Sequence, residues 1–165
     1  MPKSVYWDSC CFISLIQREA GRYSDVRGVY DDAERGNLII VTSTLTISEV
    51  CKVRCDEGVG NPRSKMSTDG DAFLDRFFDN DFFRLVELSP SVATVARTLF
   101  RTHPQVRITN DAVHLATAIS ENVDEMHTYD GNDLISLSKR VRRKDGEPLP
   151  IDVPRSFQGS LLGHE

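Results

Sequence analysis

The sequence lacks two features that would assign the protein to a common class. No stretch approaches the roughly 20 consecutive apolar residues that cross a bilayer, and the first residues contain no apolar core of a signal peptide. From these two absences we expect a cytoplasmic protein with no membrane span. Positive charge is not in excess either, because the formal net charge is −5. Contact with nucleic acid would require a local group of cations or a bound metal ion.

Cysteine motifs typical of zinc sites are missing as well. The four cysteines form an adjacent pair, Cys10 and Cys11, and a pair one helical turn apart, Cys51 and Cys55, with no CxxC spacing. Nothing in the sequence indicates secretion, so we expect no disulfides. Four reduced, mostly buried thiols are the favoured interpretation, and a zinc site is the weaker one.

Short β-rich runs alternate with amphipathic segments along the chain. The 165 residues, of which 39% are hydrophobic and 27% charged, suit one globular domain. A glycine- and serine-rich loop is expected over residues 57–71. The pattern predicts strands over 4–7, 38–41, 83–88 and 123–128, and helices over 11–17, 24–35, 45–55, 71–78, 90–101, 109–121 and 134–142.

This order of elements predicts an α/β fold with a mainly parallel sheet. We expect residues 1–143 to form the domain. Residues 144–165 are expected to form a C-terminal extension that is irregular or carries one edge strand near Ile151. In a parallel α/β sheet, reactive groups gather beyond the carboxyl ends of the strands. A functional site is therefore expected at that edge.

Acidic residues accumulate at this edge of the predicted sheet. Asp8 follows the first strand, Glu49 lies in the helix after the second, and Asp130 follows the fourth. Asp111 lies in the first turn of a helix that precedes the fourth strand. Several unpaired carboxylates at one edge repel one another, and a hard divalent cation with oxygen ligands removes that repulsion.

Taken singly, each acid also suits an ordinary structural role. Asp8 after a strand is typical of a helix N-cap, and Glu49 has the position of a solvated glutamate beside a buried stripe. Asp111 in a first helical turn is favoured by the helix macrodipole. Asp130 and Asp133 suit a turn former and a helix cap. Only their joint placement favours a metal site.

Two further predictions concern the surroundings of these acids. His114 lies one turn after Asp111, and we expect a buried, hydrogen-bonded imidazole that orients its neighbours rather than a metal ligand. In the helix of Glu49, the residues expected to be buried are Ile47, Val50, Cys51 and Val53.

Four segments of the chain resemble the signatures of PIN domains, and they are most similar to those of VapC-type toxins. The resemblance runs from about residue 5 to residue 142, in the family's order and approximate spacing. The third segment is the most specific. The four segments are Asp8 after a short strand, Thr46-Ile47-Ser48-Glu49-Val50, Asp111-Ala112-Val113-His114-Leu115-Ala116-Thr117-Ala118 and Thr128-Tyr129-Asp130.

The resemblance implies a three-layer α/β/α sandwich with a mainly parallel sheet of about five strands. It also implies Mg²⁺ or Mn²⁺ at the acidic cluster, hydrolysis of RNA phosphodiester bonds, RNA as substrate, an antitoxin protein as partner and a homodimer. Ser9 and Thr128 match hydroxyl positions that support the cluster. Carried over by position, the carboxylates at the catalytic metal site are Asp8, Glu49, Asp111 and Asp130.

One departure from the family's pattern leaves the last ligand open. The family usually follows its last acid closely with another acid and then an aromatic residue. Here Asp133 comes one step late, and Leu134 replaces the aromatic residue. Both Asp130 and Asp133 therefore stay candidates for the metal.

Candidate groups for holding RNA are two sets of basic residues, although most such runs are only solvated faces. One set is the run over residues 139–144. The other set consists of Lys52, Arg54, Arg63 and Lys65.

Two other classes of function compete with the nuclease. One is a PIN fold that has lost hydrolysis and binds RNA or protein, and the shifted Asp133 keeps that interpretation open. The other is a phosphoryl-transfer enzyme with an aspartate nucleophile. That chemistry needs a second acid two residues after Asp8, where this chain has Cys10.

Overall fold

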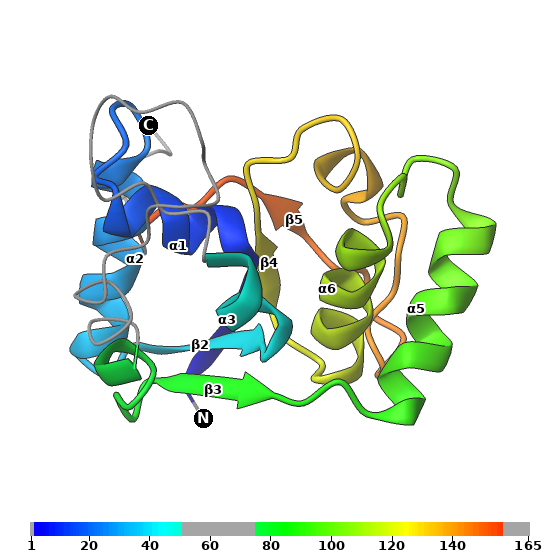
Figure 1. Ribbon diagram of the computed structural model, residues 1–165, viewed down its shortest axis with the longest axis horizontal. Coiled ribbons are helices and arrows are strands. Elements are labelled where there is room, and N and C mark those ends of the chain that lie inside the picture. The colour runs from blue at the N-terminus through cyan, green and yellow to red at the C-terminus, as the bar shows by residue number, and fades with distance from the viewer. Residues whose placement is uncertain (1, 51–74, 157–165) are drawn as a thin grey trace.

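The centre of the molecule is a single five-stranded sheet in which every strand pairing is parallel. The computed structural model describes residues 2–50 and 75–156. The strand order is β3-β2-β1-β4-β5 (Figure 1). The predicted parallel α/β sheet is confirmed. The strands are β1 (Lys3–Trp7), β2 (Leu38–Ser43), β3 (Phe83–Val86), β4 (Glu125–His127) and β5 (Ile151–Asp152).

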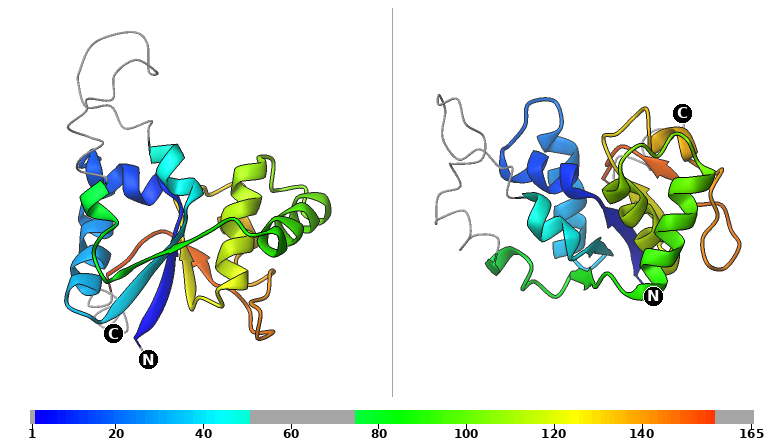
Figure 2. Two further views of the ribbon diagram at one scale, coloured as in Figure 1. Left: turned by 60° about the horizontal axis from the view of Figure 1, so that its bottom comes forward. Right: turned by 45° about the vertical axis from the view of Figure 1, so that its right-hand side comes forward.

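Helices cover both faces of the sheet, which gives three layers. Figures 1 and 2 show α1 (Ser9–Ile16) and α2 (Tyr23–Glu34) on one face, and α5 (Pro90–Thr102) and α6 (Thr109–Ser120) on the other. The short α3 (Leu45–Glu49) follows β2. The expected α/β/α sandwich is therefore present.

Alternation along the central strand divides the core between the two faces. Val5 and Trp7 pack with the residues of α1 and α2, whereas Tyr6 packs with those of α5 and α6. All three side chains are buried, as expected for a strand covered on both sides. The alternation places the Tyr6 hydroxyl on the face that carries α6.

Local sequence signals explain where several helices begin and end. Asp8 caps α1, and Ser89 caps α5 by accepting a hydrogen bond from the Val92 backbone N–H, with Pro90 in the first turn. Ser24 was predicted to start its helix, but α2 begins at Tyr23 without a side-chain cap. Gly36, with φ of 78°, directly follows the C-cap residue of α2, where glycine is favoured.

The helix predicted over residues 134–142 is wrong. Only a 3₁₀ turn, η2 (Ile135–Leu137), forms there. The reason is pairing with a distant segment: the Lys139 N–H donates to the Leu149 carbonyl, and the Leu149 N–H donates to the Val141 carbonyl. These bonds hold the segment beside the approach to β5 and replace a helical ladder.

The buried face predicted for the helix of Glu49 is also partly wrong. Ile47 is 44% exposed, whereas Thr46 and Val50 are fully buried. The Thr46 hydroxyl lies 2.7 Å from the Thr42 hydroxyl of β2, and this contact turns Thr46 toward the sheet. The predictions on Cys51, Val53, Cys55 and the loop over 57–71 fall outside the described residues.

The two cysteines at the start of α1 form no disulfide within the described residues. Cys10 and Cys11 are free thiols, and Cys11 is completely buried. None of the helices within residues 2–50 and 75–156 has the length and apolar character that crossing a membrane requires.

Candidate active site

Three acidic side chains meet beyond the carboxyl end of β4. Asp111 comes from the first turn of α6, and Asp130 and Asp133 come from the turn that follows β4. One carboxylate oxygen from each lies within 4.8 Å of the others. The turn is closed by the Asp133 N–H, which donates to Asp130 Oδ1 at 3.0 Å. Asp130 therefore has the turn role expected of it and also faces the cluster.

Asp111 is the acid with the strongest electrostatic conflict. Its Oδ2 atom is buried and has no hydrogen-bond partner among the described residues. Burial, together with the negative charge of Asp130 and, to a smaller extent, of Asp8 and Asp133, raises the pKa of Asp111 to about 6. A positive charge bound next to this carboxylate would therefore stabilise its ionised form.

Asp8 lies beside this cluster and is already hydrogen-bonded at both oxygens. Oδ1 accepts from the Cys10 N–H at 3.1 Å and from the Cys10 thiol at 2.7 Å, and Oδ2 accepts from the Thr128 hydroxyl at 2.5 Å. The same Thr128 oxygen accepts from the Asp130 N–H at 3.0 Å. Thr128 thus joins the end of β1 to the turn after β4, and Asp8 combines the N-cap role with a place at the site.

Glu49 is held from α6 by two side chains. Asn110 donates to Oε1 at 2.8 Å, and Oε2 lies 2.6 Å from His114 Nε2. Burial alone would raise the pKa of Glu49, but the hydrogen bond and the charge of His114, together with the hydrogen bonds of Asn110 and Ser9, outweigh it and lower the pKa to about 2. Glu49 is thus an ionised carboxylate at the border of the cluster, outside the group of three acids.

His114 is a buried imidazole that orients a neighbour, as its position on the helix predicted. Its Nδ1 atom lies 2.7 Å from the Tyr6 hydroxyl, which in turn accepts from the Ser43 N–H at 3.2 Å. Burial raises the pKa of Tyr6 far above its usual range, so the hydroxyl keeps its proton and donates it to Nδ1. Nε2 therefore donates a hydrogen bond to Oε2 of the ionised Glu49.

The sequence model of the PIN domain matches residues 5–139. The chain belongs to the PIN domain family. The four acids and strands β2, β3 and β4 lie within the matched range, whereas β5 lies beyond it.

Solved structures share this fold. VapC20 of Mycobacterium tuberculosis, a sarcin-ricin loop cleaving toxin, superimposes with a TM-score of 0.60 at 12% identity, over 78% of this chain and 91% of that chain. VapBC2 of Rickettsia felis, bound to a DNA fragment from its promoter, gives 0.60 at 17% identity, over 90% and 98%. FitAcB of Neisseria gonorrhoeae gives 0.55 at 17%, over 91% and 97%. A comparison with curated proteins finds no match.

The donor set of this PIN domain suits a hard divalent cation. All ligand atoms in the group of three acids are carboxylate oxygens, which Mg²⁺ and Mn²⁺ prefer. The buried, unpartnered Oδ2 of Asp111 is the specific atom that a cation would satisfy. Asp111, Asp130 and Asp133, with Asp8 and Glu49 at the border, are the candidates to hold it.

An arginine that the sequence analysis missed closes one side of the cluster. Arg107 Nε lies 2.9 Å and 3.0 Å from the two carboxylate oxygens of Asp133, and Nη2 lies 2.7 Å from Oδ1. The only sequence signal is an arginine four residues before Asp111, just ahead of α6. The contact with Asp133 depends on two loops and has no local pattern.

The basic groups proposed from the sequence do not supply a cation at this site within the described residues. Arg143 pairs with Asp124 and Asp145. Asp124 also accepts from the Ser4 N–H, at the amino end of β1. This part of the run over 139–144 therefore lies at the edge of the sheet opposite to Asp8. Lys52, Arg54, Arg63 and Lys65 fall outside the described residues.

Proposed function

We propose that this PIN domain is a divalent-metal-dependent endoribonuclease that hydrolyses RNA phosphodiester bonds. PIN domains are generally nucleases. The observation that carries the proposal is the buried Oδ2 of Asp111, which has no partner in the described part of the chain although Asp130 and Asp133 lie within 4.8 Å. A fold that only bound RNA or protein would gain nothing from this unfavourable arrangement.

The residues of the chain have distinct roles in this proposal. Asp111 and Asp130 present oxygens toward the centre, Thr128 fixes Asp8, and His114 fixes Glu49. Bound Mg²⁺ or Mn²⁺ would neutralise charge on the phosphate and make a water molecule more acidic. Asp8, Glu49 and Asp130 are already held by backbone or side-chain hydrogen bonds, so these three carboxylates need little further ordering when substrate binds.

Cleavage of a mixed RNA pool in the presence of Mg²⁺ or Mn²⁺ tests the proposal. We expect cutting that stops with a chelator and that falls about 10²-fold in Asp8→Asn, which loses one charge at an end of the cluster. Arg97→Gln, on the exposed face of α5, is the matched control and should cut normally. Cutting that survives the chelator would reject a metal-dependent nuclease. Metal binding without any cutting would favour the binding module.

Metal affinity should depend on pH because a proton competes with the cation at Asp111. With the pKa of that carboxyl raised to about 6, affinity should be constant above that pH and fall roughly tenfold for each pH unit below it. Titration calorimetry with Mn²⁺ between about pH 5 and about pH 8 measures this dependence. A flat affinity across that range would remove Asp111 from the set of ligands.

A protein partner is proposed on the basis of the structural relatives. Two of them are VapBC2 and FitAcB, and the resemblance to VapC-type toxins implies an antitoxin for this chain. A protein that binds this chain and blocks its cleavage of RNA would support that partner. A homodimer stays a prediction, and light scattering of the purified chain measures it.

A further inference from the structure

The ion pair between Arg107 and Asp133 is unequal in its exposure to solvent. The Arg107 side chain is 68% exposed and that of Asp133 only 7%. The pairing is side-on, because Nε and Nη2 contact the carboxylate. Nη1 donates no hydrogen bond to any residue within 2–50 or 75–156. A buried acid thus holds the inner edge of the guanidinium and leaves its outer edge facing solvent.

Arg107 is also the one cation that reaches the acidic centre in the described part of the chain. No other arginine or lysine there forms an ion pair with Asp8, Asp111, Asp130 or Asp133. The hydrogen bonds and the charge of Asp133, and to a smaller extent the charges of Asp130 and Asp111, raise the pKa of Arg107. A backbone phosphate approaching this cluster meets a guanidinium at its rim.

Stability gives little reason for such a pair, because the cost of removing a carboxylate from water offsets most of the attraction between the two charges. A chain with a net charge of −5 needs local positive charge to hold RNA. A guanidinium offers parallel N–H donors that match two phosphate oxygens.

We propose that Arg107 binds the RNA phosphate that lies over the acidic centre, and that Asp133 anchors this arginine instead of serving as a metal ligand. The proposal rests on the nuclease function given above. Asp130 is then the acid after β4 that holds the cation, which answers whether Asp130 or Asp133 is the metal ligand. Asp133 is then a positioning residue, and Arg107 contacts the substrate.

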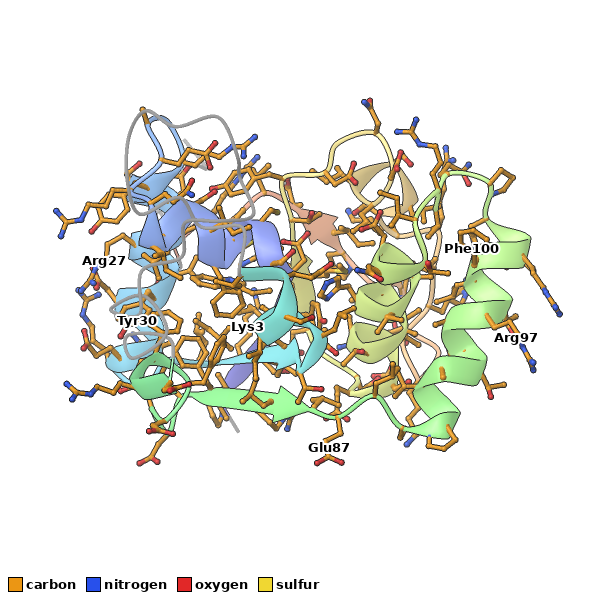
Figure 3. The ribbon with its side chains drawn as sticks, in the orientation of Figure 1. Lys3, Arg27, Tyr30, Glu87, Arg97 and Phe100 are labelled. Carbon is orange, nitrogen blue, oxygen red and sulfur yellow. The ribbon has the colours of Figure 1, made fainter. Side chains whose placement is uncertain are left out.

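Binding and cleavage of a short single-stranded RNA separate this proposal from its alternatives. Fluorescence anisotropy gives the RNA affinity at several salt concentrations, steady-state cleavage gives kcat and KM, and calorimetry gives the Mn²⁺ affinity. The variants are Arg107→Gln, Arg107→Lys and Asp133→Asn. Arg97→Gln removes the same charge from the outer surface of α5, where Figure 3 shows its side chain pointing away from the sheet.

In Arg107→Gln we expect RNA affinity to fall about tenfold and the slope of log K against log salt to decrease by about 1. Mn²⁺ affinity should not decrease. Arg107→Lys should restore the salt slope but only part of the affinity, because lysine lacks the paired donors. Asp133→Asn should raise the KM for RNA and leave Mn²⁺ binding intact, and Arg97→Gln should match the unaltered chain.

Two outcomes would overturn the proposal. An unchanged RNA affinity and salt slope in Arg107→Gln would remove Arg107 from the substrate site. A tenfold or larger loss of Mn²⁺ affinity in Asp133→Asn would make Asp133 a ligand and Arg107 merely its counterion. Failure of the nuclease proposal looks different, since the unaltered chain would then bind RNA without cutting it, and anisotropy would still measure the contribution of Arg107.

Discussion

Replacing Asp111 by asparagine is expected to abolish RNA cleavage and, at the same time, to stabilise the metal-free protein. Cleavage should fall about 10³-fold or more, because the variant loses the buried oxygen that is best placed to hold the cation. Asparagine has nearly the same size as aspartate, so packing around α6 should not change. Gain of stability with loss of activity would mark a residue kept for function.

The sign of the stability change follows from the pKa. The pKa of Asp111 is raised in the folded state to about 6, so folding favours the protonated form. Its favourable contribution is complete below the unfolded value of about 3.8 and is lost as pH rises through about 6. Near pH 8 the carboxylate therefore destabilises the fold. Since the side chain is only half-buried, we discount the shift to about 1 kcal/mol in favour of Asp111→Asn.

Urea denaturation with and without Mn²⁺ measures both halves of this prediction. The single tryptophan, Trp7, is completely buried, so its fluorescence reports unfolding. At a Mn²⁺ concentration 100 times the Kd, the unaltered chain should gain about 2.7 kcal/mol, and Asp111→Asn should gain almost nothing. Equal stabilisation of both proteins by Mn²⁺ would place the cation elsewhere.

Much of the fold could be predicted because its signals are local. The run of residues Leu38–Val41 is apolar at every position, and Thr109–Ser120 has clear helical periodicity. Each became the expected element. The failures have non-local causes. Residues 134–142 have a helical pattern, but their backbone pairs with Leu149. Ile47 was placed on the wrong face because the contact between Thr42 and Thr46 orients α3.

The acidic site was predictable to the extent that it follows from topology. Asp130 and Asp133 lie in the turn after β4, and Asp111 lies in the first turn of α6, the helix that precedes β4. Reactive groups gather beyond the carboxyl ends of parallel strands, and this rule was enough to predict that the three acids lie together. The rule gave no information on which side chains complete the site. Arg107 and Asp133 are 26 residues apart, and their contact depends on the paths of two loops.

The largest loss of stability is expected from His114→Leu. The imidazole connects three elements, because it bonds to Tyr6 of β1 and to Glu49 of α3 from its place on α6. Leucine fills similar space but leaves the Tyr6 O–H without an acceptor and Glu49 Oε2 without its His114 donor. Each loss of this kind costs about 1–3 kcal/mol, and more where the group is charged. We expect the free energy of unfolding to fall by about 3 kcal/mol.

Comparison with Tyr6→Phe distinguishes a connected network from general damage to the core. Removing the hydroxyl alone should cost about 1–2 kcal/mol, since His114 Nδ1 and the Ser43 N–H lose their partner. In the double variant His114→Leu/Tyr6→Phe, the second change should add little to the loss of stability. Both partners of the bond between the Tyr6 hydroxyl and His114 Nδ1 are then absent, so neither is left unpaired. A coupling energy of about 1 kcal/mol or more in this cycle would identify the network, whereas simple addition of the two losses would contradict it.

The cost of His114→Leu should also depend on pH. With His114 present, its hydrogen bond and charge, with the hydrogen bonds of Asn110 and Ser9, outweigh burial and lower the pKa of Glu49 to about 2. That contribution to stability is present above the unfolded pKa of glutamate and is lost as pH falls toward the folded value. In the variant, burial of a poorly paired carboxylate remains and is relieved when Glu49 is protonated. The difference in free energy of unfolding between the unaltered chain and His114→Leu should therefore be larger at about pH 7 than at about pH 4. A difference that stays constant with pH would show that His114 acts through packing alone.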